Sequence, residues 1–117
     1  MEWDSNTSPP SHLRFWNCPN LNKLSHLQHL TSIKRLSFWL CPNLYTFPHD
    51  QHLTSLQHLE FWNCRNMMDL PEVLLPSLLS LRILGDCPVL KERCSKKGDY
   101  WPFISNIPNL DLPRWEN

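Results

Sequence analysis

The chain has 117 residues, and its 11 basic and 11 acidic side chains give a formal net charge of zero. That length suits a single domain, and the balanced charge excludes a broad electrostatic attraction to nucleic acid or to anionic lipid. Only two glycines are present, Gly85 and Gly98, which excludes a glycine-rich phosphate loop and a dinucleotide-binding fingerprint. We therefore expect a protein partner, with no nucleic acid, no membrane and no cofactor.

Residues 1–11 form a lead that is rich in Ser and Pro. This segment has neither the basic start nor the apolar run of a signal peptide. The chain also lacks the run of about 18 apolar residues that a membrane-spanning helix needs. We expect a disordered lead on a cytoplasmic protein.

A short sequence motif recurs in residues 12–90. It reads "LRFWNCPNL" at 13–21, "LSFWLCPNL" at 36–44, "LEFWNCRNM" at 59–67 and, more loosely, "LRILGDCPVL" at 81–90. The cysteines of these copies follow one another at intervals of 23 residues: Cys18, Cys41, Cys64 and Cys87. A fixed period of this length indicates stacked repeats, because one such unit cannot bury its own apolar side.

Each copy begins with a strand pattern. In the third copy Leu59 and Phe61 flank Glu60, and this period of two is typical of a strand with one buried face. The spacing from Leu56 through Leu59 and Phe61 to Cys64 matches the leucine-rich-repeat rule. We predict an α/β leucine-rich-repeat solenoid of about four 23-residue repeats. A parallel β-sheet forms its concave face, and its convex side is mostly irregular or short-helical.

The recurring cysteines have a structural interpretation. A small, inward residue that can donate a weak hydrogen bond suits the position where the chain leaves a strand. Disulfides are the alternative, since neighbouring strands lie about 4.8 Å apart. Side chains in one column point the same way, however, and Cys94 makes the number of cysteines odd. We therefore expect reduced, structural thiols at Cys18, Cys41, Cys64 and Cys87.

The residues between the inward positions are predicted to face outward on the sheet. The column of Trp16, Trp39 and Trp62 beside charged residues resembles the composition of interface hot spots. Two alternatives stay open: the indoles stack and only stabilise the sheet, or a missing part of a longer chain covers them. The predicted partner-binding residues of the concave face are Arg14, Trp16, Arg35, Trp39, His58, Glu60, Trp62 and Arg82.

The fourth copy is irregular. It gains one residue between Ile83 and Cys87, and the loop before it is one residue shorter. The gain and the loss cancel, so the interval between cysteines is unchanged. The prediction that Leu84 faces outward depends on how the fourth strand is aligned with the third.

Neither a metal site nor catalysis is expected. Histidines recur in register, which superficially suggests zinc: His26 with His49, and His29 with His52. The repeat fixes no cysteine or carboxylate near them, so we interpret them as solvated loop residues. Cys94 lies near Lys96, but no histidine follows His58 to activate it as a nucleophile. We predict that the chain is not an enzyme.

Residues 91–117 have a different character and are predicted to form a capping tail. Basic residues cluster around Lys96, where we expect a solvated face, and apolar residues follow. Asp99 is predicted to cap a short helix that begins near Tyr100, with Pro102 tolerated in its first turn. This turn would close the end of the stack.

The repeats together with "CPVLKERCSKKGDYWPFISNIPNL" resemble the C-terminal end of plant nucleotide-binding leucine-rich-repeat disease-resistance proteins, in particular the coiled-coil class. The matching tail residues are Leu90, Arg93, Cys94, Gly98, Trp101, Ile104, Ile107 and Pro108. The resemblance implies a protein–protein interaction module in plant defense, which senses a pathogen effector or a guarded host protein. The coiled-coil and nucleotide-binding modules of the family are missing. We therefore expect a fragment of a larger receptor, with nucleotide bound only in the missing upstream module.

One alternative function remains from the residues. Cysteine-bearing leucine-rich repeats also serve as substrate adaptors of ubiquitin-ligase subunits. The tail motif favours the receptor, because such adaptors have no reason to end in this text.

Overall fold

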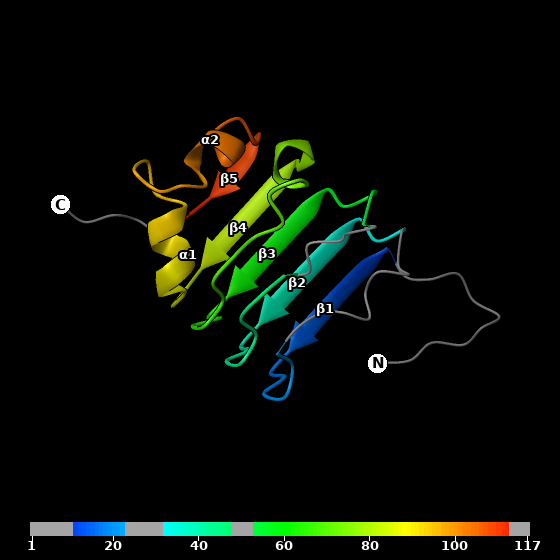
Figure 1. The fold of residues 1–117 in the computed structure, drawn as a ribbon. Helices are drawn as coiled ribbons and strands as arrows, with labels where there is room; N and C mark the ends of the chain where they lie inside the picture. The colour runs from blue at the N-terminus through cyan, green and yellow to red at the C-terminus, as the bar shows by residue number, and fades with distance from the viewer. Residues whose placement is uncertain (1–10, 23–31, 48–52, 113–117) are drawn as a thin grey trace.

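The computed structural model describes residues 11–22, 32–47 and 53–112. Five parallel strands form one sheet in chain order (Figure 1). They are β1 (His12–Trp16), β2 (Arg35–Trp39), β3 (His58–Trp62), β4 (Ser80–Leu84) and β5 (Asn109–Asp111). The described helices are short: the 3₁₀ turn η2 (Leu75–Ser77), α1 (Pro88–Arg93) and α2 (Trp101–Ile104). The chain is thus an α/β domain built on a five-stranded parallel sheet with few helices.

The first three strands pair at the repeat interval. Phe15 pairs with Phe38, and Phe38 pairs with Phe61. Trp16 pairs with Trp39 in the same register. Positions 23 residues apart in the sequence therefore lie side by side on neighbouring strands, as the recurring text predicted.

The pairing of β3 with β4 shows how the irregular fourth copy is accommodated. Glu60 pairs with Arg82 and Trp62 pairs with Leu84, which is the register expected from compensation. The extra residue follows the strand, where the Asp86 N–H donates to Asn63 Oδ1 at 2.6 Å. Because the insertion lies in the turn, β4 keeps the same face outward as its neighbours.

At the exits of β1 to β4 one residue adopts a left-handed backbone. The φ angles are 53° at Asn17, 57° at Leu40, 55° at Asn63 and 68° at Gly85. Asn and Gly tolerate this conformation, whereas a Leu there is strained. A Cβ atom at Gly85 would also meet Asn63 Oδ1, so the Asn63 side chain would have to move. The turn therefore recurs even where its sequence does not favour it.

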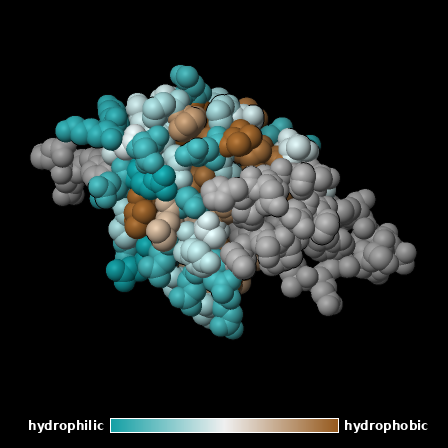
Figure 2. Space-filling model, in the orientation of Figure 1, coloured by the Kyte–Doolittle hydropathy of each residue, from teal (hydrophilic) through white to brown (hydrophobic). Residues whose placement is uncertain are grey.

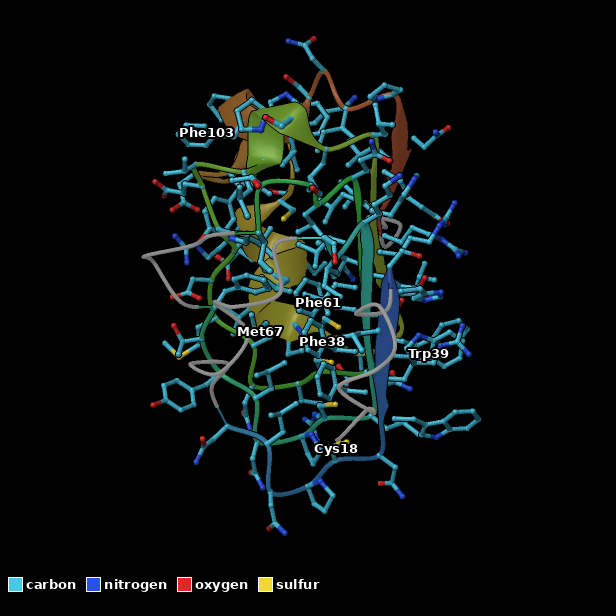
Figure 3. The ribbon with its side chains drawn as sticks, turned by 90° about the vertical axis from the view of Figure 1, so that its right-hand side faces the viewer. Cys18, Phe38, Trp39, Phe61, Met67 and Phe103 are labelled. Carbon is cyan, nitrogen blue, oxygen red and sulfur yellow. The ribbon has the colours of Figure 1, made fainter. Side chains whose placement is uncertain are left out.

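The hydrophobic core lies between the sheet and the layer of loops and short helices that follow the strands, which we call the loop layer. Figure 3 shows Phe38 and Phe61 pointing to the side where Met67 and Cys18 lie. Phe38 is fully buried, and its ring centroid lies 5.2 Å from that of Phe15 and 5.3 Å from that of Phe61. Stacked rings and buried leucines thus hold the repeats together.

The tail closes the core, but not in the way the sequence predicted. The α2 helix has no side-chain cap, so the prediction that Asp99 caps it is wrong. Asp99 Oδ1 and Oδ2 instead accept hydrogen bonds from Arg93, at 3.0 and 2.6 Å. The tail also supplies β5, an unexpected fifth strand that pairs with β4. A short strand of this kind carries too little pattern to be detected from its sequence.

Arg93 joins the tail to the loop layer. Its Nη1 donates to the Met68 carbonyl at 2.6 Å, and its guanidinium lies 4.1 Å from the centre of the Tyr100 ring. The buried Tyr100 hydroxyl accepts a hydrogen bond from the Leu70 N–H at 2.9 Å. Arg93 is therefore a structural contact and not part of a solvated basic face.

Several residues that carry the family resemblance are structural in this fold. A Cβ atom on Gly98 would meet the Arg93 backbone, so the close approach of the chain requires glycine there. Four other members of the matching set are buried: Leu90, Cys94, Ile104 and Ile107. These residues thus anchor the tail in the hydrophobic core.

Outside the core, the surface carries both hydrophobic and hydrophilic residues. In the orientation of Figure 1, hydrophobic residues form separate patches among hydrophilic ones (Figure 2). Exposed examples in the loop layer and tail are Met68, Val73 and Phe103. Within the part of the chain that the structure describes, no helix has the length and apolar character that crossing a membrane requires.

Candidate functional site

The candidate site is the open face of the sheet, by which we mean the face opposite the loop layer. Figure 3 shows Trp39 pointing away from Phe38 and Phe61 on this side. The alternation of each strand places there all eight residues that the sequence predicted as partner-binding: Arg14, Trp16, Arg35, Trp39, His58, Glu60, Trp62 and Arg82. The site is therefore assembled from four separate repeats.

The tryptophans form a stacked column. The ring centroids of Trp39 and Trp62 lie 4.8 Å apart, and those of Trp16 and Trp39 lie 5.9 Å apart. The tryptophans therefore do stack on one another, as one of the two alternatives expected. Stacking nevertheless leaves Trp16 60% exposed, and Trp39 Nε1 is buried without a hydrogen-bond partner among the described residues.

Next to the column lies a hollow of about 240 Å³. Arg14, Arg35 and Arg82 line it together with His58 and Glu60. His12, Ser37 and Ser80 also line it. The alternation of the sequence predicted that these three residues face outward, but they were not among the predicted partner-binding residues.

The charges around the hollow are unevenly compensated. Arg82 is held by Glu60 Oε1 at 3.6 Å and by Asp111 Oδ2 at 3.5 Å. The Arg14 guanidinium instead lies 5.1 Å from the centre of the Trp39 ring, a cation–π geometry. Arg35 has no ion-pair partner in the described ranges. The face therefore offers positive charge that its own carboxylates do not neutralise.

His58 is the titratable histidine most affected by this surrounding. Burial lowers the pKa of His58, and the positive charge of Arg35 lowers it further. Its imidazole is therefore neutral at pH 7. It contributes a polar wall to the hollow and no charge.

The structural cysteines lie at the strand exits, and all five cysteines are free thiols. The Cys41 thiol donates to the Phe15 carbonyl at 3.7 Å, and the Cys64 thiol donates to the Phe38 carbonyl at 3.4 Å. A thiol–thiol hydrogen bond with Cys41 and burial raise the pKa of Cys64. Burial raises the pKa of Cys87. Cys41 and Cys64 thus connect neighbouring repeats as small inward donors, whereas Cys87 donates to the Leu84 carbonyl of its own repeat.

Metal binding has no support in the described part of the chain, where no cluster of three or more His, Cys, Asp or Glu side chains fits a metal ion. The recurring loop histidines lie outside the described residues, as do residues 1–10 of the predicted lead and 113–117 of the predicted tail. Asp111 was missed as a neighbour of the site, because the strand that carries it was not expected.

Comparison with protein-family models finds no match. Comparisons with curated proteins and with solved structures also find no match.

Proposed function

We propose that the chain is a protein–protein interaction module of the leucine-rich-repeat class, with the open face of the sheet as its binding surface. In this proposal the chain is a solenoid of four repeats and a cap. Its biological setting is plant innate immunity, where it senses a pathogen effector or a guarded host protein as a fragment of a larger cytoplasmic receptor.

One observation carries the proposal. Aromatic, cationic and hydrogen-bonding side chains from four repeats converge on one face around a hollow, with three tryptophans in register. Tryptophan and arginine are the residues most enriched at interface hot spots. A surface contributed by many repeats is how repeat proteins bind extended partners.

The setting is supported by two weaker arguments. The free thiols suit a reducing compartment, and the tail residues that carry the family resemblance are used here as a cap. An adaptor of a ubiquitin-ligase subunit is the second candidate, but no contact in the structure favours it over the receptor.

The test is partner capture with matched variants. The double substitution Trp39→Ala and Trp62→Ala removes the centre of the column, and it should abolish capture of effector or host proteins from infected plant extract. The double substitution Met68→Ala and Val73→Ala removes exposed apolar side chains from the loop layer, and it should leave capture unchanged.

The identity of the captured protein separates the two candidates. A pathogen effector or its host target supports the receptor, whereas substrates marked with ubiquitin support the adaptor. If the tryptophan variant is folded and captures the same proteins as the unaltered chain, the open face is not the binding surface.

A further inference from the structure

The hollow beside the tryptophan column indicates what kind of segment the open face accepts. Its volume is about 240 Å³, below the roughly 300–1,000 Å³ typical of small-molecule and cofactor sites. It is open to solvent on the sheet face and lined by polar side chains. A single side chain of a partner fits it better than a nucleotide or other cofactor.

The charge of the hollow selects an anion. Arg82 shares two carboxylates, Glu60 and Asp111, whereas Arg14 and Arg35 have no ion-pair partner among the described residues. A carboxylate that enters the hollow meets these two exposed guanidiniums, each of which can donate charge-assisted hydrogen bonds to it.

The same geometry disfavours a long polyanion. Glu60 Oε2 is buried beside the hollow without a hydrogen-bond partner among the described residues, and Asp111 flanks Arg82. Because these carboxylates belong to β3 and β5, they repel a phosphate backbone that runs across all five strands more than a single carboxylate held by Arg14 and Arg35 on β1 and β2. With a net charge of zero, the whole chain adds no attraction that offsets this repulsion.

The spacing between the hollow and the column sets the pattern of the partner. Arg14 and Trp16 lie two residues apart on β1, as Ser37 and Trp39 do on β2. Two residues of a strand span about 6.6 Å. An extended segment running along the strands would match this distance with side chains at positions i and i+2 on one of its own faces.

We propose that the open face binds an extended acidic polypeptide segment in which a carboxylate and an aromatic or large apolar side chain are two positions apart. The carboxylate enters the hollow between Arg14 and Arg35, and the apolar side chain packs on the column of Trp16, Trp39 and Trp62. This proposal rests on the proposed function and names its partner chemistry.

The first experiment uses blocked heptapeptides with Glu at the third position and each of the twenty residues at the fifth. We expect binding when the fifth residue is Phe, Trp, Tyr or Leu, observed as a shift of the Trp39 indole N–H resonance. Replacing Glu by Gln, or the apolar residue by Ala, should weaken binding about tenfold. Absence of binding across the set overturns the proposal.

Variants of the protein locate the contact. Arg35→Gln should weaken the Glu–x–Phe peptide about tenfold, and Arg14→Gln provides a second test if the first variant fails to fold. Arg65→Gln is the matched control, because Arg65 pairs with Asp86 at 2.9 Å on an exposed turn away from the hollow. Equal loss in Arg65→Gln and Arg35→Gln, or no loss in either hollow variant, overturns the proposal.

Two further measurements distinguish a polyanion site, and a different kind of protein partner, from the proposed acidic segment. Tighter binding of heparin or single-stranded RNA than of the peptides, with the same dependence on Arg35, would identify a polyanion site and overturn the proposal. If Arg35→Gln captures the same protein partner as the unaltered chain while the tryptophan double variant does not, the acidic segment is wrong and the proposed function stands. Loss of capture in both supports the two together.

Discussion

Phe38 and Trp39 are neighbours in the chain, and each lies in a column of stacked aromatic rings. One column is buried in the core and the other lies on the open face. On the inner face Phe38 stacks between Phe15 and Phe61 and is fully buried under the loop layer. On the open face Trp39 stacks between Trp16 and Trp62 and stays partly exposed, with the Arg14 guanidinium against its ring. Stacking along a sheet is therefore common to both faces, and coverage by the loop layer decides which column is core.

The largest expected difference is in stability. Phe38→Ala leaves a cavity in the core and should lower the free energy of unfolding by about 3–5 kcal/mol. Trp39→Ala loses stacking on a half-open face and should lower it by about 1–2 kcal/mol. Urea denaturation followed by circular dichroism measures both. Equal losses would mean that the open face is as much a core as the inner one.

The inner face also depends on the cap that holds the loop layer in place. Arg93→Ala removes the hydrogen bond to the Met68 carbonyl and the contact with Tyr100, and it should cost about 2 kcal/mol. The ion pair with Asp99 adds little to this, because Asp99 is largely exposed. Lys97→Ala, an exposed change in the same segment, should stay within about 0.5 kcal/mol. A neutral Arg93→Ala in thermal unfolding would contradict a role in closing the core.

The turns that divide inner from outer positions offer a stabilising change. Leu40 has a φ of 57° where the neighbouring repeats have Asn17 and Asn63. Leu40→Asn should raise stability by about 1 kcal/mol, because asparagine tolerates the left-handed region better than leucine.

The reverse change is the control. Asn63→Leu adds the same strain and also removes the acceptor of the Asp86 N–H, so it should destabilise by more than Leu40→Asn stabilises. Unchanged melting temperatures in both variants would show that these turns carry no strain.

The smallest expected effect is the contribution of His58, on the open face, to the pH dependence of the free energy of unfolding. The folded chain holds His58 neutral because burial and Arg35 lower its pKa, whereas the unfolded chain protonates it near pH 6.5. The unfolded state therefore binds more protons, and this part of the stability is present above about pH 6.5 and lost as the pH falls toward the folded pKa. His58→Gln should flatten the fall in stability over that window.

Arg35→Gln removes one of the two causes of the His58 shift and should give an intermediate slope. The slopes come from the free energy of unfolding measured at several pH values. A His58→Gln slope equal to that of the unaltered chain would show that His58 does not report on the hollow.

The sequence was largely sufficient to predict which side chains face the core and which face the open side of the sheet. The period of two around Phe61 and the 23-residue interval between cysteines set which side chains share a face, because strand alternation and stacking are local and repetitive rules. The compensated register of β4 followed from the same counting. The hollow itself was not predicted, since His12, Ser37 and Ser80 become its walls only when the strands are side by side.

The sequence by itself determined the repeat, the strand faces and the cysteine column, because each depends on residues close together or on an exact recurrence. Only the tertiary structure decided the fifth strand, the pairing of Arg93 with Asp99 in place of a helix cap, and the lack of an ion-pair partner for Arg14 and Arg35 among the described residues. These features depend on contacts between distant segments. Their strength is set by burial and by the partners that the fold brings within reach, which no local pattern encodes.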